Sequence, residues 1–84
     1  MRQQVVESLW QLSRGQTAVV KGFTQSLTET YRVRLIELGF RPGAAIACTM
    51  APKLGAPKLY RVDNAVYSLE QKIAECIQTE SVTV

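Results

Sequence analysis

The chain has 84 residues, a formal net charge of +3 and 46% hydrophobic residues, a composition typical of one small folded domain. It contains no histidine, the commonest side-chain ligand of transition metals, and no apolar stretch reaches the roughly 18 residues that cross a bilayer. Polar residues interrupt the segment Met1–Glu7, so a secretion signal is not expected. We predict a single domain over residues 1–84 and a cytoplasmic protein.

The first predicted elements are a short helical turn and a strand. The apolar cluster in Ser8–Leu12 indicates one helical turn that closes an end of the core. Thr17–Phe23 is rich in strand-favouring residues. Gly15 lies where a turn into this strand is needed, and Gly22 lies where a bend or bulge is expected.

An amphipathic helix is predicted from Leu27 to Leu38. Ser26 and Glu29 have the spacing of a capping box, in which each side chain satisfies a free backbone N–H at the start of a helix. The apolar residues then recur at helical spacing and predict a stripe that faces the core. This predicted stripe consists of Leu27, Tyr31, Leu35 and Leu38.

The end of this helix is the most specific local signal in the chain. Gly39 lies where a left-handed C-cap is favoured, and Phe40 follows it, as suits the apolar contact that seals such a cap. Pro42 prevents the helix from resuming, and Pro42–Gly43 predicts a turn into a strand.

Three strands are expected in the second half of the chain. Alternation over Ala44–Met50 predicts a strand whose Ile46, Cys48 and Met50 point into the core. The turn cluster Pro52–Pro57 then separates it from a second strand. The other predicted segments are the strand Lys58–Val62, a tight turn at Asp63–Asn64 and a strand over Ala65–Tyr67.

The last segment allows two interpretations. Ser68 and Gln71 fit a second capping box, which predicts one helical turn followed by a strand around Glu75–Thr79. The spacing of Ile73, Cys76 and Ile77 also fits a continuing helix. Glu80–Val84 is expected to fray or to add an edge. Short strands with one inserted helix and frequent turns predict a mainly β protein, a small and strongly bent barrel.

The chain offers no recognisable catalytic or metal-binding motif. Cys48 and Cys76 have no close pairing motif and are predicted to be buried, unpaired thiols. There is no Gly-rich phosphate loop, nucleophile elbow or histidine base, so we predict neither an enzyme nor a bound cofactor. The carboxylates show no ligand spacing, and no metal site is predicted from Glu29, Glu37, Asp63, Glu70, Glu75 and Glu80.

At this point the sequence resembles the FeoA family, the small accessory proteins of bacterial ferrous iron transport. The matching positions are spread over most of the chain. They are Ser8, Leu9, Leu12, Gly15, Arg32, Leu35, Leu38, Gly39, Phe40, Pro42, Gly43, Ala51, Pro52, Leu54, Gly55, Pro57, Tyr67, Ser68, Leu69, Ala74 and Ile77.

The resemblance implies an SH3-like barrel with a helical insertion. It also implies an adapter or regulator that works beside a membrane permease with a cytosolic guanine-nucleotide-binding domain. A stand-alone chain of this length resembles the accessory protein more than a domain fused to a permease or repressor. Glu70 and Gln71 depart from the family, whose members often carry a basic residue there.

Charge suggests where such a partner would bind. Six basic residues lie between Arg32 and Arg61, against Glu37 alone, whereas the segment that follows is acidic. We predict contacts to the permease, with no direct membrane insertion, at Arg32, Arg34, Arg41, Lys53, Leu54 and Lys58. The alternative is a small basic barrel that binds nucleic acid, which the acidic C-terminal third disfavours. Barrel edges can also pair between copies, so the sequence leaves open a homo-oligomer.

Overall fold

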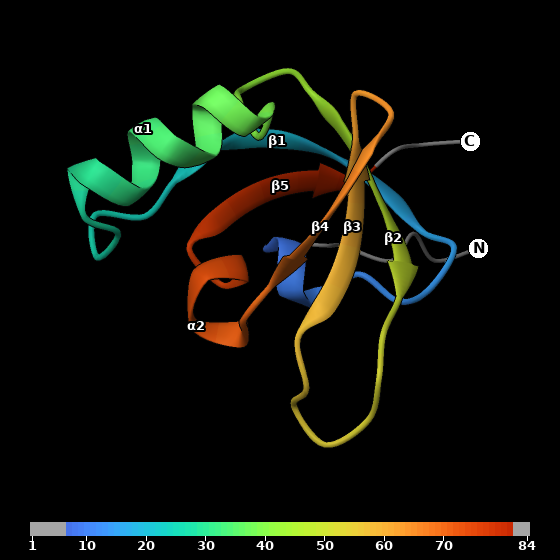
Figure 1. Cartoon of the computed structure of the whole chain (residues 1–84). Helices are drawn as coiled ribbons and strands as arrows, with labels where there is room; N and C mark the ends of the chain where they lie inside the picture. The colour runs from blue at the N-terminus through green and yellow to red at the C-terminus, as the bar shows by residue number, and fades with distance from the viewer. Residues whose placement is uncertain (1–6, 82–84) are drawn as a thin grey trace.

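The strands form one strongly bent antiparallel sheet in the part of the chain that the computed structural model describes, residues 7–81. The strand order is β4-β3-β2-β1-β5. β3 and β4 run steeply across the front, and β1 and β5 run behind them (Figure 1). The mainly β class is therefore confirmed. The elements are η1 (Leu9–Gln11, a 3-10 turn), β1 (Thr17–Phe23), α1 (Glu29–Leu38), β2 (Ala45–Met50), β3 (Lys58–Val62), β4 (Ala65–Leu69), α2 (Gln71–Ala74) and β5 (Ile77–Ser81).

The predictions for residues 8–23 are confirmed. The predicted helical turn is η1, and the first strand has the predicted bounds. The side chain of Gln11 accepts hydrogen bonds from the backbone N–H groups of Glu7 (2.6 Å) and Ser8 (3.1 Å), which steadies the start of the turn. The register of β1 against β5 shifts between Val20 and Gly22, so the predicted bulge is present.

The start of α1 differs from the prediction. Thr28, not Ser26, is the N-cap, and its hydroxyl oxygen accepts a hydrogen bond from the Tyr31 N–H at 3.3 Å. Ser26 instead lies in the preceding turn, where its hydroxyl is 2.7 Å from that of Thr24. Both residues are suitable caps, and the turn after β1 decides between them because it sets where helical backbone angles begin.

The end of α1 is as predicted. Gly39 has a φ of 116°, and the N–H of Phe40 donates to the carbonyl of Leu35 at 2.9 Å, as in a left-handed C-cap. Phe40 is fully buried and packs edge-to-face against Tyr67, with ring centroids 5.8 Å apart. The cap thereby anchors the C-terminal end of the helix to the core.

Tyr31 was predicted in the core stripe of α1, and this prediction is wrong. Leu27 and Leu35 are buried and Leu38 packs against the core, but 49% of Tyr31 is exposed. The first turn of α1 projects beyond the sheet (Figure 1), and the side chain of Tyr31 is only about half covered. Periodicity indicates which side of a helix faces inward, but not how far the core extends along it.

The β2–β3 and β3–β4 connections follow the prediction, with one correction. Ile46 and Cys48 point into the core, whereas Met50 is exposed. The register between β2 and β3 shifts between Cys48 and Met50, which ends the inward alternation early. Asp63 and Asn64 both have positive φ, at 50° and 67°, as in the type I′ turn of a two-residue hairpin.

In the C-terminal segment the structure shows one short helix followed by a strand, rather than a continuing helix. Ser68 lies inside β4 and caps no helix; Glu70 precedes the short α2 instead. The helix does not continue, because β5 begins at Ile77 rather than at the predicted Glu75. β5 includes Glu80 and Ser81, while the predictions for residues 1–6 and 82–84 lie outside the described residues.

The core lies between the two halves of the bent sheet. Its largest fully buried side chain is Tyr60, whose hydroxyl donates to the carbonyl of Leu9 at 3.2 Å and ties η1 to β3. Both cysteines are unpaired, as predicted, but Cys48 is buried and Cys76 is half-buried. The buried apolar residues are Leu9, Leu12, Ala18, Val20, Leu27, Leu35, Phe40, Ile46, Cys48, Tyr60, Val62, Leu69, Ala74 and Ile77.

Candidate partner-binding surface

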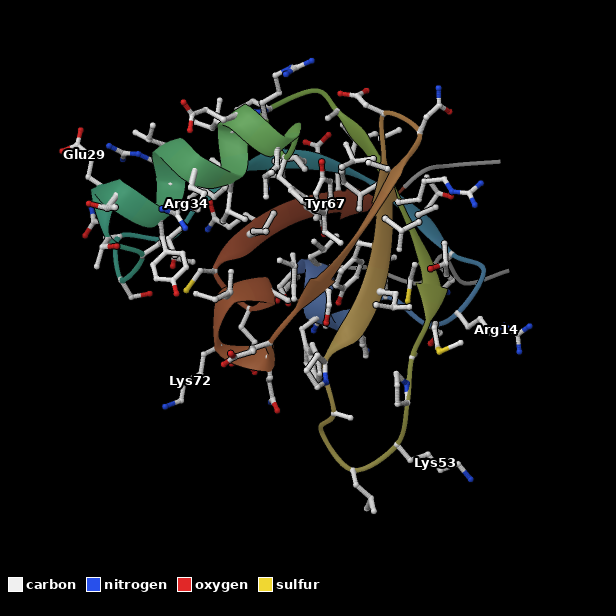
Figure 2. The ribbon with its side chains drawn as sticks, viewed as in Figure 1. Arg14, Glu29, Arg34, Lys53, Tyr67 and Lys72 are labelled. Carbon is white, nitrogen blue, oxygen red and sulfur yellow. The ribbon has the colours of Figure 1, made fainter. Side chains whose placement is uncertain are left out.

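The predicted contact residues do not form one surface. Arg34 lies on α1, whereas Lys53 lies on the loop between β2 and β3 at the opposite end of the molecule (Figure 2). Arg41 lies in the turn after α1 and pairs with Asp63 in the β3–β4 turn, at 3.6 Å between Nη2 and Oδ2. The fold thus separates residues that the sequence places in one basic segment.

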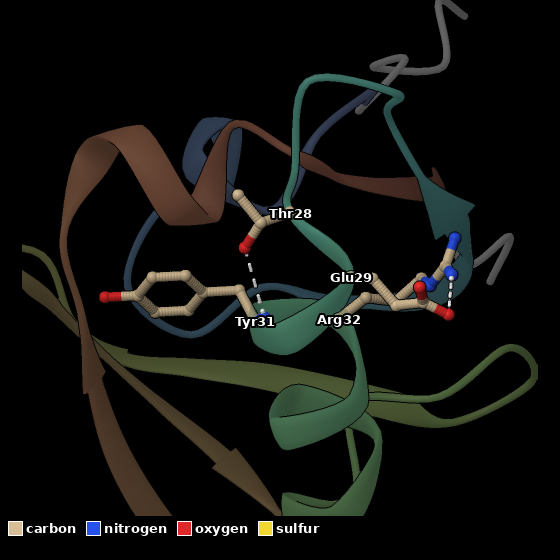
Figure 3. Close-up of polar contacts among 4 residues, drawn as sticks. All are labelled: Thr28, Glu29, Tyr31 and Arg32. Atoms are coloured by element: carbon tan, nitrogen blue, oxygen red, sulfur yellow. Dashed lines mark hydrogen bonds and ion pairs between the residues drawn. The ribbon is translucent and has the colours of Figure 1, made fainter.

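The side chains of Arg32 and Arg34, both on α1, differ in whether they have an ion-pair partner among the described residues. Arg32 pairs with Glu29 one turn away, with Nη2 and Oε1 3.3 Å apart (Figure 3). The Arg34 side chain is exposed, and its guanidinium makes no ion pair or hydrogen bond with any other residue in the range 7–81. A guanidinium without an internal partner keeps its donors for another molecule.

Apolar side chains stand exposed on both sides of Arg34 around the helix, Tyr31 on one side and Val33 on the other. Tyr31 is 49% exposed and Val33 is 47% exposed. A shallow groove of about 410 Å³ runs along the helix and is lined by Glu29, Thr30, Val33, Arg34 and Glu37. We call the set Tyr31, Val33 and Arg34 the α1 surface.

Sequence reasoning found Arg34 but missed the other two members of the α1 surface. Tyr31 was assigned to the core. Val33 carried a usable signal, because it lies on the side of the helix opposite Leu35 and so had to be exposed if Leu35 was buried.

The loop between β2 and β3 projects on its own at the other end. Leu54 is fully exposed, so its side chain contributes no buried apolar area to the stability of the fold. Its backbone has a φ of 66°. Between this loop and α2 lies an open groove of about 650 Å³ that mixes acidic and basic groups. Its lining includes the two residues that depart from the family pattern and consists of Gly55, Pro57, Glu70, Gln71, Lys72 and Glu75.

Lys58 has an internal role rather than an exposed one. Its ammonium donates to the carbonyls of Trp10 and Leu12, the latter at 3.0 Å, and lies 4.5 Å from the centre of the Trp10 ring. These contacts fasten the middle of η1 and the residue that follows it to β3, and the cation–π contact adds to them. We therefore leave Lys58 out of the candidate surface.

Replacing Lys58 by methionine is expected to lower the free energy of unfolding by about 1.5–3 kcal/mol, because hydrogen bonds from a charged donor are lost while the apolar stem remains. Urea denaturation measures this loss. The matched control is Lys21→Met on the exposed side of β1, where the change is expected to stay within about 0.5 kcal/mol. Equal stability of the two variants would contradict the internal role of Lys58.

The buried titratable groups serve the fold. Burial raises the pKa of the Cys48 thiol, and the nearby Lys58 charge only partly opposes this shift. Burial, with a smaller effect of Cys48, also raises the pKa of Tyr60, which stays protonated as the donor to Leu9. Both groups are neutral at neutral pH.

Metal ions, membranes and nucleic acids each require particular features of the residues that bind them. Within residues 7–81, no three His, Cys, Asp or Glu side chains lie close enough together to hold a metal ion. In that same range, no helix is both long and apolar enough to span a membrane. Among residues 7–81, Tyr31 is the one exposed aromatic residue and the other five are buried or partly buried, so the described surface offers few aromatic rings on which bases could stack.

The sheet order and the inserted helix define the class of SH3-like small barrels. The chain belongs to the FeoA family, because the model of the FeoA domain matches residues 7–81. The family comprises non-enzymatic accessory proteins of ferrous iron transport. A comparison with curated protein sequences found no match.

Solved structures of FeoA proteins share this fold. The crystal structure of a FeoA described as an iron uptake regulatory protein superposes with a TM-score of 0.79 at 20% identity, over 94% of this chain and 100% of that one. FeoA from Stenotrophomonas maltophilia, a prokaryotic SH3 domain protein solved with zinc, gives 0.78 at 25% identity, over 89% and 91%. Iron(II) transport protein A from Clostridium thermocellum gives 0.79 at 27% identity, over 89% of this chain and 45% of that one.

Proposed function

We propose that this protein is cytoplasmic and binds the cytosolic guanine-nucleotide-binding domain of the ferrous iron permease through the α1 surface. Membership of the FeoA family supports the transport system as the setting. The observation that carries the proposal is Arg34, which lies without an ion-pair partner among the described residues, beside the exposed Tyr31 and Val33.

The composition of the α1 surface suits a protein partner. Arginine and aromatic residues are enriched in the centres of interfaces, where they supply most of the binding free energy. The planar guanidinium of Arg34 can donate two parallel hydrogen bonds to one carboxylate. The expected patch on the permease therefore places a carboxylate at Arg34, with apolar side chains that contact Tyr31 on one side of it and Val33 on the other.

The remaining predicted contacts lie outside this centre. Arg32 already pairs with Glu29, and Arg41 pairs with Asp63. A partner protein that bound either arginine would have to break the corresponding internal ion pair. Lys53 and Leu54 lie on the projecting β2–β3 loop, and they remain predicted contacts for a second part of the permease. A partner surface of ordinary size, about 800 Å² on each side, is large enough for α1 without reaching that loop.

A calorimetric titration tests the proposal. The purified G domain of the permease from the same organism is titrated with this protein in the presence of GDP, of a non-hydrolysable GTP analogue, and without nucleotide. Saturable binding that differs among these states supports a nucleotide-sensing adapter. Absence of binding in all of them would contradict the G domain as the partner.

The charge reversal Arg34→Glu is expected to weaken this complex by at least about tenfold, because it replaces the donor of a carboxylate pair with a like charge. The salt dependence of the affinity is expected to fall as well. The control Arg14→Glu makes the same change in net charge on the side of the molecule away from Arg34 (Figure 2). Equal weakening by both variants would show that net charge, rather than the α1 surface, controls binding.

A further inference from the structure

The outer edge of β4 presents backbone groups that no other part of the described chain uses. In a hairpin with a two-residue type I′ turn, the residues that flank the turn exchange hydrogen bonds. Val62 and Ala65 are this pair, so along β4 the residues Ala65, Tyr67 and Leu69 bond to β3. The N–H and C=O groups of Val66 and Ser68 must then point away from β3. Within residues 7–81 these groups make no hydrogen bond.

The opposite edge of the sheet is not free in this way. Ser8 forms an antiparallel bridge with Gln78 on the outer side of β5. The carbonyl of Glu7 accepts a hydrogen bond from the N–H of Thr79 at 3.1 Å. The segment before η1 therefore covers the centre of the β5 edge, and β4 offers the open one.

β4 also lacks the features that usually protect an edge strand from pairing. Its sequence Ala-Val-Tyr-Ser-Leu has no charge and no proline. Its register against β3 runs from Lys58–Leu69 to Val62–Ala65 without a bulge, whereas the β1–β5 and β2–β3 pairs are both interrupted. Val66 is 46% exposed, so the solvent side of the strand is accessible. An uncharged, regular and exposed edge is a template for another strand.

We propose that two copies of this protein pair through β4, antiparallel, about a twofold axis at Tyr67. This register aligns the whole of β4 with the β4 strand of the second copy. It places Val66 opposite Ser68 of the second copy, so the outward N–H and C=O groups of each meet those of the other. The two sheets then form one continuous sheet across the dimer.

The same register is compatible with the charges that flank β4. Asn64 lies opposite Glu70 of the second copy, and Asp63 lies opposite its Gln71, so no two like charges are directly opposed. A second copy suits this edge because its β4 has the same length, the same alternation of outward backbone groups and no charge. A contact of a surface with its own copy requires that the surface complement itself, and β4 meets this condition. The proposal is independent of binding to the permease.

Sedimentation equilibrium over a range of concentrations tests the dimer. The wild-type protein is expected to show a monomer–dimer equilibrium. Ser68→Pro removes an outward N–H from each copy but no bond to β3, so the fold is expected to remain while the dimer dissociation constant rises by about tenfold or more. Ser68→Thr keeps the N–H and favours a strand, and it is expected to dimerise at least as well as the wild type.

A second variant and a second readout keep the test decisive. Val66→Lys places a charge on the edge and is expected to abolish the dimer with little change in circular dichroism. Amide hydrogen exchange at Val66 and Ser68 is expected to slow as the wild-type concentration rises. The proposal is overturned if the wild-type protein stays monomeric at the highest concentration reached. It is overturned equally by a dimer that forms without protection of these amides, or by one that Val66→Lys leaves unchanged.

Discussion

Replacing Phe40 by alanine is expected to lower the free energy of unfolding by about 3–5 kcal/mol. Phe40 is fully buried, and the substitution removes its edge-to-face contact with Tyr67 and leaves a cavity where the end of α1 meets the sheet. Small domains have a total stability of about 5–15 kcal/mol, so this loss brings the protein close to unfolding. Urea denaturation at constant temperature measures the change.

The matched comparison for Phe40 is Tyr31, another aromatic residue of the same segment. Because about half of Tyr31 is exposed, Tyr31→Ala is expected to cost less than about 1 kcal/mol. The conservative variant Phe40→Leu, which keeps most of the apolar volume, is expected to lie between these two. A similar loss for Phe40→Ala and Tyr31→Ala would contradict the proposed anchoring of α1 by Phe40.

The substitution Gly39→Ala is expected to cost about 2–4 kcal/mol, which combines backbone strain with overpacking. Gly39 has a φ of 116°, which L-residues rarely adopt. An added Cβ would lie 2.9 Å from Oδ2 of Asp63 and 3.1 Å from Cγ2 of Val62. The Asp63 side chain can move aside, but Val62 is buried in β3 and cannot. Thermal or urea unfolding measures the loss.

Gly15 offers a control for Gly39 that separates the two causes. It also has a positive φ, at 88°, but nothing lies within 4 Å of the position its Cβ would take. Gly15→Ala is therefore expected to cost only the backbone term, about 1–2 kcal/mol. Equal losses at the two glycines would show that the approach of β3 to the helix end has no energetic consequence.

These two expected results concern the same part of the molecule, the junction between α1 and the sheet. Gly39 allows the chain to turn back against β3, and Phe40 then fills the core. The C-terminal end of α1 is thus rigidly anchored, while its first turn projects with Tyr31 exposed (Figure 1). If the α1 surface binds the permease, changes at this junction should weaken binding indirectly, through the position of the helix. Arg34→Glu should weaken it without loss of stability.

Much of the fold could be predicted because its signals are local. The bounds of β1, the C-cap at Gly39 and the tight turn at Asp63–Asn64 depend on residues within a few positions of one another. Backbone sterics and capping hydrogen bonds act over that range. The helix start was misplaced at Ser26 because two competent caps, Ser26 and Thr28, stand two residues apart.

The candidate site was harder to predict because it depends on packing. The sequence counted Arg34, Lys53 and Lys58 as members of one basic segment, yet the fold sends Arg34 and Lys53 to opposite ends and uses Lys58 to hold η1. Tyr31 matched the core stripe but extends past the sheet.

The sequence by itself determined the mainly β class, most element boundaries, the helix end and the resemblance to the FeoA family, since these follow from short-range patterns along the chain. Only the tertiary structure decided which cations remain free, which aromatic ring is exposed and which sheet edge is open. Each of these properties depends on which distant segments of the chain pack beside a residue. For example, Val62 of β3 packs beside Gly39, and the carbonyl of Leu12, next to η1, accepts a hydrogen bond from Lys58. The neighbours of a residue in the fold decide whether it is buried or paired, so a pattern of nearby residues in the sequence does not predict either.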